Sequence, residues 1–267
     1  MDTIKLTMPK PRMIAHRGLS GLERENTCAA FVAAGNRSYF GIETDVHRTS
    51  DGQYVIIHDD TTTRVAGVEL TVEETDMATL RQLRLTDVGT ELPRGDLCLP
   101  TLDEYISICK KYDKTAVLEL KNRMPDEAVW EIAEIVADHD YLAKTVFISF
   151  SLDNLIALRA KYPHQKAQYL LSKIEDPDAL LETLTTYRLD LDVKHIALTK
   201  EVVERIHAAG LEVNVWTVDA PEDAARVMDM GVDYITSNIL ECSLCRGMMR
   251  SVSAHTVCEV RKNGYGA

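Results

Sequence analysis

The chain has 267 residues, of which 45% are hydrophobic and 27% are charged, and its net charge is −12. This length and composition suit a single globular domain with a sizeable core over residues 1–267. The acidic balance argues against a duplex nucleic-acid partner, because such a protein needs a basic surface to displace counterions. A small anionic substrate stays open, since a bound metal ion and a few cations can set the local field.

No targeting or membrane segment is predicted at the start of the chain. Residues 1–11 are short and polar and lack the apolar core of a signal peptide. No stretch approaches the roughly 20 apolar residues of a membrane helix. We therefore expect a cytoplasmic protein with no stable membrane insertion.

From residue 12 onward, short β-branched apolar runs alternate with amphipathic helical stretches, which predicts parallel strands joined by helical crossovers. The expected strands are Arg12–Arg17, Ile42–Arg48, Thr115–Lys121, Val146–Phe150, Ala167–Leu171, His195–Leu198, Glu212–Val218 and Asp233–Asn238. The expected helices include Thr27–Ala34, Asp126–Ala137, Leu152–Lys161, Asp176–Thr186, Lys200–Ala209 and Pro221–Met230. This pattern favours an α/β fold, a closed (β/α)8 TIM barrel, over an open sheet.

One further strand does not fit the barrel count. Gln53–His58 follows the second strand across the turn Ser50-Asp51-Gly52, and so short a connection makes an antiparallel pair. We expect a β-hairpin at the C-terminal mouth of the barrel. We interpret residues 59–100 as a small insertion with one or two short helices, and residues 241–267 as a C-terminal tail.

Acidic side chains fall inside two of the expected strands. Glu43 and Asp45 are two residues apart and share one face of a strand, and Glu119 lies near the end of the third strand. Three acids converging inside a barrel would repel one another unless a cation lay between them. Their hard oxygen atoms favour Mg²⁺ or Ca²⁺ over Zn²⁺. The alternative is that the acids face outward and pair with lysines on the helices.

Two histidines are expected at the same mouth, His16 at the end of the first strand and His58 at the end of the hairpin arm. Histidine titrates near neutral pH, so two imidazoles beside a metal-bound phosphoryl group can act as an acid–base pair. Arg17 and Lys121 could hold phosphate oxygens. Trp216, near the end of the seventh strand, could contact a substrate alcohol or pack in the core.

The chain has six cysteines, and three of them, Cys28, Cys98 and Cys109, are scattered in segments expected to be structured, which fits reduced thiols rather than a disulfide framework. Near the C-terminus, Cys242 and Cys245 together with His255 and Cys258 have spacings that could ligate a structural zinc ion. The competing interpretation is that these are ordinary helix and tail cysteines.

Several short motifs follow one another in a specific order along the chain. They are His16-Arg17-Gly18, Glu25-Asn26-Thr27, Gly41-Ile42-Glu43-Thr44-Asp45-Val46, Thr49-Ser50-Asp51-Gly52, His58-Asp59, Pro100-Thr101-Leu102-Asp103-Glu104, Leu118-Glu119-Leu120-Lys121, Ser149-Phe150, Val215-Trp216-Thr217 and Gly231-Val232-Asp233-Tyr234-Ile235-Thr236. Together they resemble the glycerophosphodiester phosphodiesterase family over roughly residues 12–240. The chain departs from the family pattern at Arg24, where a proline is frequent, and at Thr236-Ser237-Asn238-Ile239, which lacks a proline that many members carry.

The resemblance implies a TIM barrel, one divalent cation (Mg²⁺ or Ca²⁺), and hydrolysis of small glycerophosphodiesters to sn-glycerol 3-phosphate and an alcohol. Matched by position, the implied metal ligands are Glu43, Asp45 and Glu119, the implied acid–base pair is His16 and His58, the phosphate-binding residues are Arg17 and Lys121, and a substrate contact is Trp216. The Glu25-Asn26 motif is expected to hold the loop after the first strand.

Other functions stay open at this point. A lysophospholipase D or a sphingomyelinase D-like enzyme of the same superfamily would share the histidines and acids, as would a non-catalytic metabolite-binding barrel that had kept them. A metal-dependent isomerase would need a base beside a carbonyl instead. The sequence does not reveal the head group, the choice between Mg²⁺ and Ca²⁺, the roles of the two histidines, the nucleophile or the oligomeric state.

Overall fold

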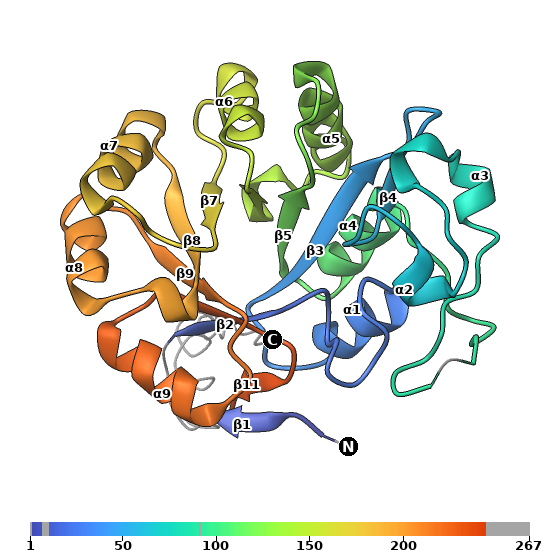
Figure 1. The fold of residues 1–267 in the computed structure, drawn as a ribbon, viewed down its shortest axis with the longest axis horizontal. Helices are drawn as coiled ribbons and strands as arrows, with labels where there is room; N and C mark the ends of the chain where they lie inside the picture. The colour runs from blue at the N-terminus through green and yellow to red at the C-terminus, as the bar shows by residue number, and fades with distance from the viewer. Residues whose placement is uncertain (1, 7–10, 91, 244–267) are drawn as a thin grey trace, which may run out of the picture.

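The computed structural model describes residues 2–6, 11–90 and 92–243, and its main feature is a closed barrel of parallel strands (Figure 1). In ring order the barrel strands are β2 (Arg12–Ala15), β3 (Gly41–Arg48), β5 (Thr115–Leu120), β6 (Thr145–Ser149), β7 (Ala167–Leu171), β8 (Asp190–Lys194), β9 (Val213–Trp216) and β10 (Tyr234–Ser237). The sheet closes on itself because β2 pairs with both β10 and β3. The predicted (β/α)8 barrel is confirmed.

Helices form an outer ring around the barrel (Figure 1). They are α1 (Cys28–Gly35), α4 (Leu102–Lys111), α5 (Asp126–Asp138), α6 (Leu152–Lys161), α7 (Pro177–Tyr187), α8 (Lys200–Ala208) and α9 (Pro221–Met230). The six predicted helices are present, each within one residue of its expected ends. Helix α4 was not predicted, although Thr101 and Glu104 form a capping box at its start, which is a signal readable in the sequence.

The predicted strand His195–Leu198 is wrong. The strand at this place is β8, and His195–Ala197 forms a 3-10 turn after it. The apolar residues around Ile196 suggested a strand, but Ile196 is exposed, whereas Leu191 and Val193 of β8 pack in the main core. Between them β8 carries Asp192, and an acid facing the barrel interior weakens the usual apolar signal of a strand.

The predicted hairpin and insertion are both present. β4 (Tyr54–Ile56) runs antiparallel to β3. The insertion contains α2 (Thr63–Ala66), a 3-10 turn (Val72–Glu74) and α3 (Met77–Leu80). These elements share a separate apolar cluster that also includes Ile57, the neighbour of His58. The packing of the insertion therefore fixes the backbone that carries His58.

Two short strands pair near the ends of the described chain. β1 (Ile4–Leu6) lies parallel to β11 (Leu240–Cys242). The sequence does not predict this pair, because two three-residue strands leave little periodic signal. Of the candidate zinc ligands, Cys245, His255 and Cys258 lie outside the described residues. Within residues 2–6, 11–90 and 92–243, no helix has the length and apolar character needed to cross a membrane.

Candidate active site

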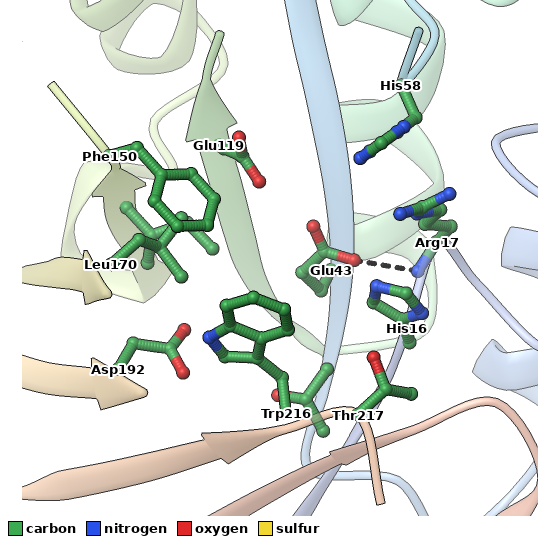
Figure 2. A pocket seen from close by; sticks show the side chains of 12 residues that line it. His16, Arg17, Glu43, His58, Glu119, Phe150, Leu170, Asp192, Trp216 and Thr217 are labelled. Atoms are coloured by element: carbon green, nitrogen blue, oxygen red, sulfur yellow. Dashed lines mark hydrogen bonds between the residues drawn. The ribbon is translucent and has the colours of Figure 1, made fainter. Parts of the chain in front are cut away.

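A pocket of about 140 Å³ lies at the carboxyl ends of the barrel strands (Figure 2). Its lining residues are His16, Arg17, Glu43, His58, Glu119, Ile148, Phe150, Leu170, Asp192, Trp216, Thr217 and Thr236. Six of the eight predicted site residues belong to this lining. The other two, Asp45 and Lys121, lie beside it in ionic contact with Arg17 and Glu119.

Three carboxylates from two neighbouring strands converge beside the pocket. Glu43 and Asp45 alternate along β3, and Asp45 is the register partner of Glu119 on β5. All three are buried, and one oxygen from each lies within 4.8 Å of the others. Burial and the charge of Asp45 raise the pKa of Glu43, and they raise the pKa of Glu119 to about 7. Buried oxygen ligands at this spacing fit a hard divalent cation, which would relieve their repulsion.

Two cationic side chains offset part of this negative charge. Arg17 Nε lies 3.6 Å from Asp45 Oδ2, while Lys121 Nζ lies 2.9 Å from Glu119 Oε1 and 3.6 Å from Asp45 Oδ1. Burial alone would raise the pKa of Asp45, but these two cations outweigh it and hold the pKa below its ordinary value. Asp45 Oδ1 accepts no hydrogen bond, so this oxygen is available as a metal ligand.

The loop after β2 is tied to the acidic cluster. Arg17 has a left-handed backbone with φ of 52°, and its N–H donates to Glu43 Oε2 over 2.8 Å. Its guanidinium donates to Glu25 over 2.8 Å. The Asn26 side chain donates to Asp45 Oδ2 over 2.8 Å, and its backbone N–H donates to the Arg17 carbonyl. These contacts agree with the expectation that the Glu25-Asn26 motif holds this loop.

Gly18, the last residue of the first motif, should tolerate no side chain. Its φ is +75°, and an added Cβ would lie 2.7 Å from the carbonyl carbon and the Cβ of Ala30. Gly67 is a matched control, because its φ is +67° but an added Cβ there would meet nothing within 4 Å. In urea denaturation, Gly67→Ala should therefore cost about 1 kcal/mol of unfolding free energy, from backbone strain alone. Gly18→Ala should cost the same strain plus a further ~1–3 kcal/mol of unfolding free energy from overpacking. Equal losses of unfolding free energy in the two variants would contradict the close contact with Ala30.

His16 is oriented by the loop that follows β10. Its Nδ1 lies 2.8 Å from Asn238 Oδ1. The Asn238 side-chain nitrogen donates to Asp219 Oδ2 over 2.6 Å, which keeps the amide oxygen turned toward the imidazole. Burial and the nearby Arg17 charge lower the pKa of His16 to about 4, so the ring is neutral at neutral pH. The sequence pattern does not single out Asn238 or Asp219.

His58 is oriented by the insertion. Its Nδ1 lies 2.6 Å from Asp59 Oδ1, and Arg64 of α2 donates to both Asp59 and Glu25 over 2.6 Å. Because Glu25 also pairs with Arg17, Arg64 connects the two loops that carry the histidines. Burial lowers the pKa of His58, although the carboxylates around it oppose this effect. Arg64 is a third residue that the sequence pattern does not reveal.

The opposite wall of the pocket is largely apolar. Trp216 ends β9, and its ring meets the ring of Phe150 edge-on with centroids 5.7 Å apart. Leu170 and Ile148 line the same pocket. The exception is Asp192 of β8, which is buried and was not predicted as a site residue. Trp216 lines the pocket, and its role as a substrate contact stays a prediction.

Known proteins resemble this chain over most of its length. The sequence model of the glycerophosphoryl diester phosphodiesterase family matches residues 16–241. A glycerophosphodiester phosphodiesterase of Caldanaerobacter subterraneus is 29% identical to this chain and covers 86% of this chain and 94% of its own length. One of Bacillus altitudinis is 28% identical and covers 84% of this chain and 93% of its own length. A phosphodiesterase of Oleispira antarctica, solved with the product sn-glycerol-3-phosphate, has a TM-score of 0.78 and 30% identity, covering 86% of this chain and 93% of that one.

Proposed function

This chain belongs to the glycerophosphoryl diester phosphodiesterase family, and we propose that its pocket hydrolyses small glycerophosphodiesters to sn-glycerol 3-phosphate and an alcohol. The proposal depends most on one observation: two histidines, two cations and three buried carboxylates meet at a single pocket. The similar structure that holds sn-glycerol-3-phosphate supports the same substrate class. A barrel that only bound a metabolite would have no use for a paired acid and base.

We assign Glu43, Asp45 and Glu119 as the ligands of one divalent cation, Mg²⁺ or Ca²⁺. Their hard oxygens, burial and mutual repulsion support this assignment. When bound, such an ion would neutralise the negative charge of the phosphoryl oxygens. Arg17 lines the pocket and can donate to the same oxygens, whereas Lys121 is held against the carboxylates and adds positive charge behind them.

The hydrogen bonds of the two histidines support different roles. Asn238 Oδ1 can only accept, so His16 carries its proton on Nδ1 and has an unprotonated Nε2. We therefore propose that His16 removes the proton from the nucleophile, which can be water or the glycerol 2-hydroxyl of the substrate. Burial lowers the pKa of His58, but the Asp59 carboxylate bonded to it opposes that effect and stabilises the protonated ring, so we assign His58 to protonate the leaving alcohol.

A lipid-acting enzyme is the main competing function, and it would need an exposed apolar mouth. Among the apolar residues of the insertion, Val65 is buried and Leu70 packs into the cluster of the insertion, while Val68 is 48% exposed. Val88 and Leu92 of the same insertion are also exposed. These residues do not separate the two functions. We keep small diesters as the proposed substrates because the similar structure holds sn-glycerol-3-phosphate, and an assay with a lysolipid decides between the two.

The direct test is release of glycerol 3-phosphate from glycerophosphocholine and glycerophosphoethanolamine, with Mg²⁺, with Ca²⁺ and with a chelator. We expect metal-dependent release from both substrates and little hydrolysis of lysophosphatidylcholine. Preferred hydrolysis of the lysolipid would move the function to the lipid-acting relatives. If folded protein released nothing with either ion, the proposed hydrolase would be wrong.

A further inference from the structure

Two buried polar atoms on the apolar wall of the pocket lack partners. Asp192 is 2% exposed, and its Oδ1 accepts no hydrogen bond, although Asn214 is a hydrogen-bond partner of the same carboxyl group. The indole Nε1–H of Trp216 is buried and also donates to nothing. Among the residues that the structure describes, Asp192 has no cationic partner. Buried polar atoms are rarely left in this state, so a group from outside the chain is expected to bind them.

Asp192 lies across the barrel from the reacting groups. In ring order β8 is four strands away from β3, which carries Glu43, so the two strands are opposite in the eight-stranded ring. Figure 2 shows Asp192 on the other side of the pocket from His16, with the indole nitrogen of Trp216 turned toward it. A phosphodiester held beside His16 and Arg17 would therefore extend part of its organic portion toward Asp192.

The chemistry of the two unpartnered atoms matches one hydroxyl group. A carboxyl oxygen accepts, an indole N–H donates, and a hydroxyl does both. The surrounding Ile148 and Leu170 are apolar and suit the carbon atoms next to such a hydroxyl. A cationic head group fits less well, because burial raises the pKa of Asp192 and favours its neutral form.

We propose that Asp192 and Trp216 bind the terminal hydroxyl of the glycerol moiety, and so select glycerol diesters over diesters that lack this hydroxyl. The inference rests on the hydrolase function proposed above. In glycerol 3-phosphate the terminal hydroxyl is the one farthest from phosphorus, which suits a wall opposite the phosphate-binding residues. The 2-hydroxyl is nearer phosphorus, so in this orientation it would lie on the side of the proposed base.

The test compares glycerophosphocholine, whose choline carries no hydroxyl, with its analogue that lacks the terminal glycerol hydroxyl. The wild-type enzyme should hydrolyse the analogue with a kcat/KM roughly 10–100-fold lower, the effect of one buried hydrogen-bonded group. Asp192→Leu should lower kcat/KM for glycerophosphocholine by a similar factor and should change kcat/KM for the analogue little. The loss from removing the hydroxyl and the loss from removing the carboxyl should therefore not add. Leucine removes both the unsatisfied Oδ1 and the hydrogen bond with Asn214, and these two effects on stability oppose each other, so the Tm should change little.

Three outcomes would overturn the inference. The first is equal wild-type efficiency on both substrates, which needs no variant. The second is an Asp192→Leu protein with a lower Tm and equal losses on both substrates, as expected for a purely structural acid. Trp216→Phe, which removes the indole N–H and keeps an aromatic ring, provides the same comparison if the leucine variant does not fold. The third is a wild-type protein that turns over neither substrate, which refutes the hydrolase function and the subsite together.

Discussion

Replacing either His16 or His58 by alanine is expected to lower kcat by about 10²–10⁴-fold, the range of general acid–base catalysis. KM should change much less, because Arg17 and the three carboxylates proposed to hold the cation are untouched, and these groups are the ones expected to bind the phosphodiester. His16 is fixed by Asn238, and His58 by Asp59. Neither ring can therefore move to replace the other. Each single variant should show most of the loss of kcat that a variant lacking both histidines would show.

The two variants should differ in their response to the leaving group. 4-Nitrophenolate leaves without being protonated, so the 4-nitrophenyl diester of glycerol 3-phosphate should restore much of the activity of His58→Ala. His16→Ala should stay impaired on this substrate, because the nucleophile still has to lose its proton. The measurement is kcat/KM on the 4-nitrophenyl diester and on glycerophosphocholine for both variants.

The matched control for the histidine variants is His164→Ala, since His164 is exposed in the turn between α6 and β7. Its activity should equal that of the wild type on both substrates. Rescue of His16→Ala rather than His58→Ala would exchange the proposed roles. Near-normal turnover by both variants would remove the acid–base pair from the mechanism.

Local periodicity predicts which side chains enter the barrel and at which end. Glu43 and Asp45 share a face because side chains alternate along a strand, and Asp45 meets Glu119 because β3 and β5 are neighbouring parallel strands. The same rule places His16 at the mouth, directly after β2. These residues could be identified from the sequence because their positions depend on the strand that carries them.

The groups that orient these residues could not be found in the same way. Asn238 bonds His16 from 222 positions along the chain, and Arg64 reaches Glu25 only because the insertion folds over the mouth. Such contacts depend on closure of the barrel and on packing of the insertion, which leave no periodic pattern. Asp192 was not identified from the sequence for a related reason. Its charge interrupts the apolar pattern of β8, so the strand was predicted at the neighbouring apolar residues around Ile196 instead.

Chelating divalent cations, or replacing Glu119 by glutamine, is expected to lower kcat/KM on the order of 10³-fold, equivalent to the several kcal/mol that a metal ion contributes to charge stabilisation. The two changes should differ in stability. An ion at 100 times its Kd stabilises the native state by about 2.7 kcal/mol, so Mg²⁺ or Ca²⁺ should raise the wild-type Tm by roughly 5–10 °C. Glu119→Gln removes one buried negative charge, so its metal-free Tm should exceed that of the metal-free wild type and respond less to the ion.

The stability of the metal-free protein should also depend on pH through Glu119. Burial and the Asp45 charge raise the pKa of Glu119 from 4.5 to about 7, so between these values the folded state binds more protons than the unfolded state. The contribution of this group is fully present below its unfolded pKa and is lost as the pH rises through about 7, and glutamine should remove that loss. Calorimetry in chelator from about pH 5 to about pH 8 measures this loss of stability.

The control for this experiment is Glu127→Gln, since Glu127 is exposed on α5. Two results would contradict a metal ion among these carboxylates. One is a metal-free wild type whose Tm changes with pH no more than the Tm of Glu119→Gln, and the other is an enzyme whose activity does not change on chelation.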